Sequence, residues 1–174
     1  RRHGTCCERA SPIRPEKTPA MKILLINPNT TQAMTDAIAQ AARAVASPGT
    51  EIVAVQPSFG PVSIECHYDE AFAAAGVAEQ MRLAAAWRPN AVVVACFGDP
   101  GLEAAREATD APVLGIAEAA FHAAGMLATG FSVVTTMTRT CIMAERLLQR
   151  YGARAWLTRI MFTWGAAAMA MAFV

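Results

Sequence analysis

The sequence predicts an α/β fold with a parallel sheet, and three observations support this prediction. Short apolar runs alternate with helical patterns from residue 21 to residue 152. The run at residues 91–95 holds only alanine and valine, as is typical of a strand buried on both faces. Proline, glycine and asparagine separate these runs, as expected where strands and helices end. Strands that alternate with helices favour parallel pairing through right-handed crossovers.

The first twenty residues differ from the rest of the chain. They are rich in arginine, contain three prolines and show no apolar periodicity. We therefore expect a disordered tail at residues 1–20 and a native start at Met21, the alternative being a targeting arm. An apolar strand pattern begins directly after this methionine.

Five strands and five helices are expected to follow in alternation. An apolar stripe from Met34 to Val45 indicates the first helix, which ends at residues 47–49. The second helix is expected from Asp69, its predicted N-cap, to Trp87. The last one ends at Gly152. The strands are expected at 23–26, 52–55, 91–95, 112–115 and 131–135, and the remaining helices at 100–109, 118–127 and 138–151.

Composition limits the class of protein. The 174 residues are 54% hydrophobic and 17% charged, so the chain can bury a core. A net charge of +1 gives no electrostatic basis for binding nucleic acid or an anionic membrane. The five cysteines form neither a CxxC pair nor an even set, which argues against a disulfide framework and a metal site. We therefore expect a reducing, cytoplasmic setting.

The pattern changes after Gly152, where a further strand and helix would be expected. Residues 153–174 form an apolar segment without acidic residues. Three interpretations stay open: a truncated or frameshifted end, a buried closing helix, and a membrane helix that Arg159 interrupts. We expect four parts: a tail at 1–20, a first α/β half at 21–117, the start of a second half at 118–152 and this atypical segment at 153–174.

A single cysteine stands at the carboxyl end of the 91–95 strand. Gly98 allows a tight turn, and Asp99 and Pro100 suit the start of the next helix. Open α/β sheets bind ligands at this edge, and a thiol beside a helix N-terminus should ionise more easily. We therefore predict that Cys96 is a catalytic base or nucleophile. The alternative is that Cys96 is a small buried apolar residue.

Two other polar loops also follow predicted strands. Asn27 and Asn29 offer amide groups, and Asn29 with Gln32 resembles a capping box. Thr135 and Thr136 offer hydroxyl groups at another helix start. Capping alone would explain each loop, but three such loops at the carboxyl edge of one doubly wound sheet favour a ligand site.

The loop at residues 56–68 is long enough to cover such a site as a lid. Glu65, His67, Asp69 and Glu70 are metal-ligating residue types, but they would not share one side, so we predict no metal. A thiol-protease pair of His67 and Cys96 lacks a third, orienting group. Neither GxGxxG nor GxxxxGK[ST] occurs, which argues against a nucleotide cofactor.

Four motifs between residues 21 and 151 belong together. They are LINPNTT at 25–31, GPVSIE at 60–65 followed by YDE at 68–70, Cys96 after the valine run, and VVTT at 133–136. This set resembles the hydantoin racemase branch of the aspartate/glutamate racemase superfamily. The resemblance implies a parallel-sheet racemase fold of two α/β halves, the first complete here and the second partial, with the site between them and no cofactor.

The resemblance also implies the roles of individual residues. In such enzymes one cysteine from each half faces the α-carbon of the substrate, and a thiolate removes a proton while the opposing thiol delivers one. Carried over, Cys96 is the cysteine of the first half. The implied substrate is a small cyclic ureide such as hydantoin or allantoin, or an amino-acid derivative, and assembly into a homo-oligomer stays open. The implied substrate-binding residues are Asn27, Asn29, Gly98, Thr135 and Thr136.

One departure from the family pattern stands out. The second cysteine should follow a strand after Gly152, and no cysteine occurs there. Cys141 lies within the helix after Thr136, and Cys66 stands where relatives often have serine, so neither is expected to replace it. We therefore expect a truncated or frameshifted racemase homologue with impaired activity. The alternatives are a non-catalytic homologue, or a decarboxylase or isomerase of the same superfamily.

Overall fold

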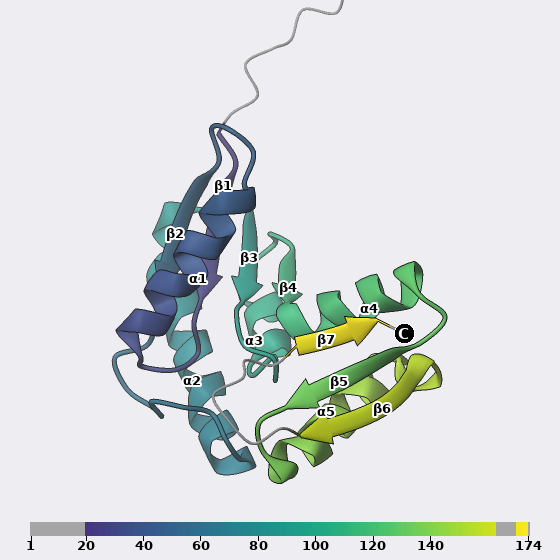
Figure 1. Ribbon diagram of the computed structural model, residues 1–174. Coiled ribbons are helices and arrows are strands. Elements are labelled where there is room, and N and C mark those ends of the chain that lie inside the picture. Colours follow the sequence, from purple (N-terminus) through teal and green to yellow (C-terminus); the bar gives the residue numbers. More distant parts are fainter. Residues whose placement is uncertain (1–19, 163–169, 174) are drawn as a thin grey trace, which may run out of the picture.

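Two separate sheets organise the chain (Figure 1). The computed structural model of the protein describes residues 20–162 and 170–173. The first sheet has four strands in the order β2-β1-β3-β4, and the second has three in the order β6-β5-β7. We call residues 21–115, which carry the first sheet, the N-terminal unit, and residues 116–162 with 170–173 the C-terminal unit.

The sheet of the N-terminal unit is parallel throughout. Ile26 lies opposite both Val55 and Val94, so three neighbouring strands end at almost the same level. The loops that follow them therefore share one edge of the sheet. The strands are β1 (Lys22–Ile26), β2 (Glu51–Val55), β3 (Ala91–Val94) and β4 (Val113–Gly115).

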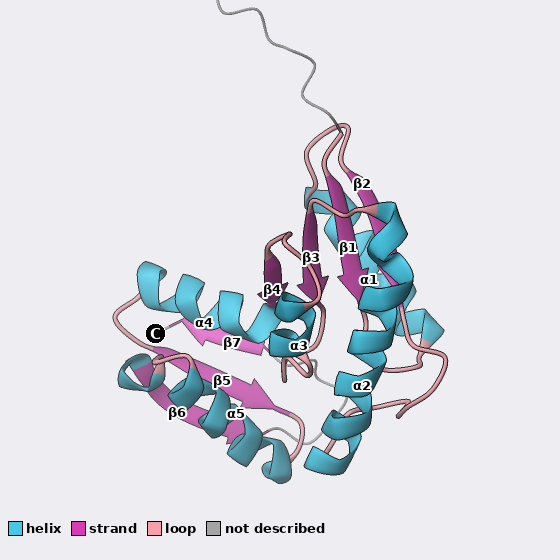
Figure 2. Ribbon diagram, turned by 180° about the vertical axis from the view of Figure 1, so that it is seen from behind, coloured by secondary structure: helices cyan, strands magenta, loops and turns pink. Residues whose placement is uncertain are grey.

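Helices cover both faces of this sheet (Figures 1 and 2). They are α1 (Gln32–Val45), α2 (His67–Ala84), the short 3₁₀ helix η1 (Ala85–Trp87) and α3 (Leu102–Glu107). Val77 and Met81 of α2 and Leu102 of α3 form one buried cluster with Leu24 and Val92. Helices on both faces explain why the 91–95 run is apolar without alternation.

The C-terminal unit has its own core. Phe121 and Phe131 stack with ring centroids 5.7 Å apart and pack with Leu148. Strand β5 pairs in parallel with β6 and antiparallel with β7. The elements are α4 (Ile116–Leu127), β5 (Phe131–Thr135), α5 (Thr138–Arg150), η2 (Arg154–Trp156), β6 (Leu157–Phe162) and β7 (Ala170–Phe173).

Most predicted elements are confirmed, and the differences are local. The helix expected at 100–109 extends only from Leu102 to Glu107, because Asp99 and Gly101 have positive φ values of 46° and 71°. After residue 152, the described residues 157–162 and 170–173 form strands, so both helical interpretations are wrong there. The tail predicted at 1–20 lies almost wholly outside the described residues.

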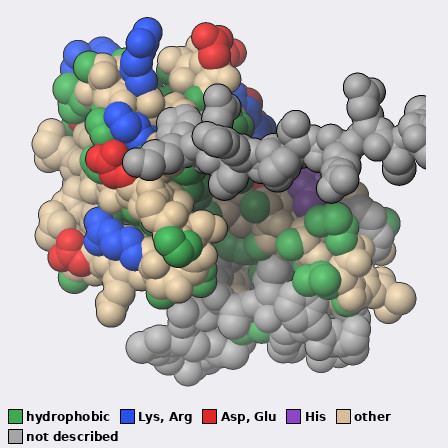
Figure 3. Space-filling model, turned by 90° about the horizontal axis from the view of Figure 1, so that it is seen from above, with side chains coloured by type: hydrophobic (Ala, Val, Ile, Leu, Met, Phe, Trp, Pro, Cys, Tyr) green, Lys and Arg blue, Asp and Glu red, His purple; other side chains and the backbone are tan. Residues whose placement is uncertain are grey.

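The length of the helices and the surface charges of the described part complete this description. None of the helices in residues 20–162 is long and apolar enough to cross a membrane. On the face shown in Figure 3, lysine and arginine side chains are mixed with aspartate and glutamate. This mixture agrees with the low net charge of the chain.

Candidate active site

Cys96 lies at the carboxyl edge of the first sheet, as predicted. The N–H of Ala95 donates to the carbonyl of Ile26 at 2.8 Å, so the end of β3 is still tied to β1. The N–H of Asp99 then donates to the carbonyl of Cys96 at 3.0 Å and closes a turn. We call residues 96–99 the Cys96 turn. The side chain of Cys96 is half-buried in it.

The predicted easy ionisation of Cys96 is wrong for this structure. Burial raises the pKa of the thiol to about 12, because the thiolate would lose its hydration. The N–H of Gly98 opposes this pKa shift, while the carboxylates of Asp99 and Glu70 add to it. Helix α3 begins only at Leu102, so the thiol does not lie at its N-terminus. The resting form of Cys96 is therefore the protonated thiol.

Asp99 caps a different helix from the one predicted. Its side chain is 1% exposed and makes no hydrogen bond to α3. Its carboxylate accepts the N–H of Ala117 at 3.0 Å and the N–H of Glu118 at 2.8 Å, both in the first turn of α4. The hydroxyl of Tyr151 also donates to it, at 2.9 Å. The Cys96 turn is thereby joined to the start of α4 and, through Tyr151, to the end of α5.

Asn27 and Asn29 are buried in the loop after β1 and order that loop. The amide of Asn27 donates to Asn29 Oδ1 and to Thr35 Oγ1, each at 2.9 Å. Asn29 Oδ1 also accepts the N–H of Thr31 at 2.9 Å. Thr31, not Asn29, is the N-cap of α1, so the predicted capping box with Gln32 is wrong. The asparagine loop nevertheless lies at the same sheet edge as Cys96.

The loop at residues 56–66 connects the asparagine loop to the C-terminal unit. Thr30 N–H donates to the carbonyl of Pro61 at 3.0 Å, and the hydroxyl of Thr31 donates to the carbonyl of Val62 at 2.7 Å. Further along, Glu65 pairs with Arg139 of α5 at 2.9 Å. The loop therefore spans from the first sheet edge to the start of α5.

Thr135 ends β5 of the second sheet and Thr136 follows it, so the prediction of three loops on one sheet edge is wrong. Thr135 is buried, and its hydroxyl lies 2.5 Å from the hydroxyl of Thr140. Thr136 is exposed. Among the described residues, no hydrogen bond joins Cys96 to Asn27, Asn29 or either threonine.

The start of α2 also differs from the prediction. The helix begins at His67, and Cys66 occupies the N-cap. Asp69 stands in the first turn and reaches back to accept the N–H of Glu65 at 3.0 Å and the thiol of Cys66 at 3.2 Å. These hydrogen bonds lower the pKa of Asp69, with a smaller contribution from Arg139. Asp69 therefore fixes the loop that precedes the helix.

A pocket of about 230 Å³ lies beside the Cys96 turn, between the two units. His67 Nδ1 is 2.8 Å from a carboxylate oxygen of Glu70, and Arg146 donates to His67 Nε2 at 3.0 Å. Since arginine only donates, Nε2 is the acceptor in this contact, and Nδ1 is left to donate to Glu70. Sequence reasoning missed this contact between α2 and α5. The lining residues are His67, Glu70, Gly98, Met143, Arg146, Leu147 and Arg150.

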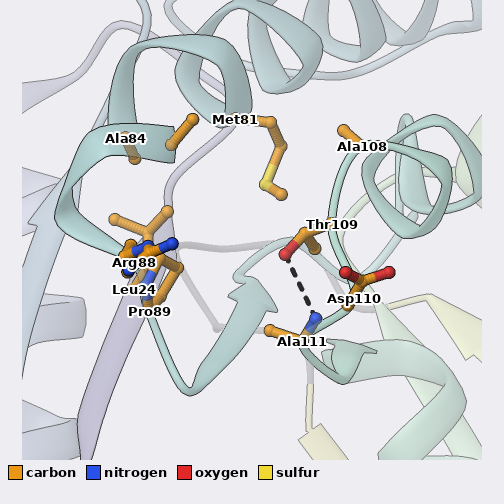
Figure 4. Close-up of a pocket in the computed structure, with 10 residues that line it drawn as sticks. Leu24, Met81, Ala84, Arg88, Pro89, Ala108, Thr109, Asp110 and Ala111 are labelled. Atoms are coloured by element: carbon orange, nitrogen blue, oxygen red, sulfur yellow. Dashed lines mark hydrogen bonds between the residues drawn. The ribbon is translucent and has the colours of Figure 1, made fainter.

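A second pocket, of about 380 Å³, lies at the opposite edge of the first sheet (Figure 4). It is formed by Leu24, Met81 and the turns that lead into β3 and β4. Its polar groups are those of Arg88, Thr109 and Asp110, and Thr109 Oγ1 accepts the N–H of Ala111 at 3.1 Å. Since parallel sheets bind ligands at their carboxyl ends, this pocket is not part of the candidate site.

Comparisons with known proteins agree on one family. Residues 23–163 match the family described as Asp/Glu/hydantoin racemase. A hydantoin racemase from Pseudomonas sp. (strain NS671) is 52% identical over 132 residues, which cover 76% of this chain and 53% of that protein. An allantoin racemase structure from Klebsiella pneumoniae is similar with a TM-score of 0.81 and 54% identity, covering 82% of this chain and 58% of the other.

A second allantoin racemase structure, from Pseudomonas fluorescens, has a TM-score of 0.76 and 40% identity over 82% of this chain and 60% of its own. The chain thus spans between 53% and 60% of the length of these three relatives. The similarity confirms the predicted parallel-sheet racemase-like fold and the family resemblance of the motifs.

Proposed function

The chain belongs to the Asp/Glu/hydantoin racemase family, and we therefore propose that it acts in racemising a cyclic ureide such as hydantoin or allantoin, or a related amino-acid derivative. Relatives at 52% and 54% identity that bear the names hydantoin racemase and allantoin racemase support this proposal. The observation that carries it is the position of Cys96, a thiol at the carboxyl edge of the first sheet beside a polar pocket.

The proposed chemistry is proton transfer at the α-carbon by cysteine. A thiolate removes the α-proton and becomes a thiol, and the neighbouring carbonyl of the substrate delocalises the electron pair that is left. A thiol on the other face then delivers its proton and inverts the centre. Because burial raises the pKa of Cys96 to about 12, its thiol form is suited to deliver a proton. In that step the S–H bond breaks, a C–H bond forms, and the resulting thiolate accepts the N–H of Gly98.

The proposed binding groups come from three loops, one of which is the Cys96 turn. Gly98 lines the pocket, while Asn27 and Asn29 hold the loop at the adjacent strand end. Thr136 is exposed and offers its hydroxyl to a substrate carbonyl or ring amide, and buried Thr135 holds the strand end through Thr140. We assign no cofactor to this site, since neutral donors can stabilise the enolate of a ureide ring.

We propose that the 174 residues alone exchange the α-proton faster than they racemise. The other described cysteines lie at the start of α2 and within α5, where Cys141 Sγ is 3.8 Å from the carbonyl of Met137. Neither is offered as the opposing acid or base. A single cysteine can exchange the α-proton on one face: its thiolate, formed by loss of the thiol proton to solvent, removes the α-proton and becomes a thiol. That thiol exchanges its proton with D₂O and returns deuterium to the same face, without inversion.

The test follows both processes in one sample. Each enantiomer of a 5-substituted hydantoin is incubated with the full chain in D₂O, with NMR reporting α-deuterium and polarimetry reporting inversion. We expect Cys96→Ala to lower exchange by about 100-fold or more, as for loss of a general acid or base. Cys141→Ala is the matched control and should retain exchange. Equal exchange in parent and Cys96→Ala would refute the proposal.

A substrate panel addresses the decarboxylase alternative. Release of CO₂ from a disubstituted malonate, without α-deuterium exchange in hydantoins, would assign the chain to different chemistry on the same fold. We also propose a reducing, cytoplasmic setting, supported by the free thiols of Cys66, Cys96 and Cys141. Homo-oligomer formation is proposed as well. Analytical ultracentrifugation of the purified chain tests it, because a homo-oligomer would sediment with a mass that is a multiple of the monomer mass of 18.4 kDa.

A further inference from the structure

The Cys96 turn makes two side-chain contacts with the C-terminal unit. The ring of Phe97 packs edge-on against Phe121, with centroids 5.2 Å apart and an interplanar angle of 81°. Phe97 thereby joins the core of the C-terminal unit, although it belongs to the loop after β3. Asp99, at the other end of the turn, supplies the second contact through its carboxylate.

Asp99, which lies outside α4 and is not its N-cap residue, accepts the N–H groups that an N-cap side chain would normally bind. The N-cap position itself is Gly115, which has no side chain to offer. A methyl group at Gly115 would lie 2.5 Å from each carboxylate oxygen of Asp99, so only glycine leaves room for this carboxylate. The backbone of Asp99 has a φ of 46°, a left-handed conformation that aspartate tolerates better than most residues.

Tyr151 completes the arrangement from the end of α5. Its hydroxyl donates to the same oxygen of Asp99 that accepts the N–H of Glu118. Its ring packs against the cores of both units. A buried carboxylate with three donors from two helices is held in one place, because each lost donor would leave a buried charge less compensated.

We propose that Asp99 is a positioning residue for Cys96: its carboxylate fastens the Cys96 turn to α4 and Tyr151. The carboxylate also places a negative charge in the same turn as the thiol. The catalytic meaning of this inference depends on the proposed function, but the attachment and the charge effect do not. Asp99 lies only three positions from Cys96, and its N–H holds the carbonyl of Cys96.

The charged groups around the thiol agree on the direction of this effect. The carboxylates of Asp99, in the same turn, and of Glu70, in α2, both raise the pKa of Cys96. Around Asp99, burial and the carboxylate of Glu118 raise its pKa, and the N–H groups of α4 and the Tyr151 hydroxyl lower it. Glu118 is paired with Arg106, and Arg150 lies over the Tyr151 ring and pairs with Glu103.

The test measures alkylation of Cys96 in a full chain whose other four cysteines are replaced by serine. Rates with neutral iodoacetamide and anionic iodoacetate are compared between pH 7 and 9, where the thiolate fraction sets the rate. We expect Asp99→Asn to raise the iodoacetate rate about threefold more than the iodoacetamide rate, because a negative charge has left the approach path. Asp110→Asn, at the opposite sheet edge, is the matched control.

The pH dependence of the two rates, together with their ratio, distinguishes a loss of negative charge near the thiol from a less rigid Cys96 turn. A fall of about one unit in the thiol pKa increases the thiolate tenfold, and the lower nucleophilicity leaves a net gain of about threefold at a fixed pH. A merely structural role would raise both reagent rates equally and leave their ratio unchanged. An unchanged ratio in folded Asp99→Asn, to within about 1.5-fold, would therefore overturn the charge effect.

If Asp99→Asn does not fold, Tyr151→Phe tests whether Asp99 attaches the Cys96 turn to the C-terminal unit. This variant keeps the charge and removes one hydroxyl, so we expect amide exchange at Ala117 and Glu118 to accelerate about threefold or more, with the reagent ratio unchanged. Tyr68→Phe, at an exposed tyrosine, is its control. Unaltered amide exchange would refute the attachment. If the unmodified chain shows no α-deuterium exchange, the proposed function is refuted, while the alkylation and amide-exchange results still test the role of Asp99.

Discussion

The two units hold their polar groups in different ways. In the N-terminal unit, the asparagine loop finds its partners within the same unit, through Asn29, Thr31 and Thr35. In the C-terminal unit, α4 takes the cap for its first turn from Asp99 of the other unit. The first unit can therefore order its edge alone, whereas the second depends on the Cys96 turn for its geometry.

The largest effect is expected from a substitution in the aromatic core of the C-terminal unit. Phe121→Ala should lower the free energy of unfolding by about 3–5 kcal/mol, because a fully buried ring is replaced by a cavity. Hydrogen exchange should show faster exchange in α4 and α5 than in β1 and β3. Equal acceleration in both sheets would mean that the two units unfold as one and would remove the contrast between them.

Gly115→Ala tests the shared cap with the next largest effect. The added methyl group cannot coexist with the Asp99 carboxylate, and we expect a loss of about 2–3 kcal/mol in urea unfolding. Gly98→Ala is a suitable control for stability, since a methyl group there meets its nearest atoms at 3.9 and 4.0 Å. If both substitutions cost the same, α4 does not rely on Asp99.

Thr35→Val tests the self-sufficiency of the asparagine loop. The hydroxyl of Thr35 accepts from the Asn27 amide at 2.9 Å and also contacts Gln56. Its removal leaves the buried Asn27 amide only the carbonyl of Thr31, at 3.4 Å, in place of this acceptor, which should cost about 1–3 kcal/mol in thermal or urea unfolding. Exposed Thr136→Val should cost less than about 0.5 kcal/mol. A similar cost for the two would show that burial of Asn27 does not matter.

The smallest expected effect concerns the ion pair between Glu65 and Arg139, which joins the 56–66 loop to α5. Both side chains are partly exposed, so a double-mutant cycle with alanine should give a coupling energy below about 1 kcal/mol that falls with added salt. A coupling above about 2 kcal/mol would show that the surface contact, rather than Asp99, holds the units together.

Local patterns were sufficient to predict the alternating elements and the place of Cys96. The valine run of β3 and the stripe of α1 are determined by burial, which leaves a period in the sequence. Residues 170–173 were not predicted as a strand, because alanine and methionine favour helices and only pairing with β5 decides otherwise. Residues 157–162 were not predicted as a strand either, although Thr158, Ile160 and Phe162 are residue types that favour one.

The environment of Cys96 could not be predicted from its neighbours in sequence. Asp99 followed by Pro100 and Gly101 is a pattern for a local helix cap, yet its partners begin at Ala117. The one available signal was Gly115, a residue without a side chain at the start of a helix. The raised pKa of the thiol likewise results from packing of distant segments, including Glu70 of α2.

The two cores occupy consecutive stretches of the chain, and this has a consequence for biosynthesis. The buried cluster of the N-terminal unit uses residues between Leu24 and Val113, and that of the C-terminal unit uses residues between Ala117 and Ala153. The first core therefore leaves the ribosome before the second core is complete. Until α4 and Tyr151 are in place, the Asp99 carboxylate lacks the three donors that compensate its burial in the folded protein.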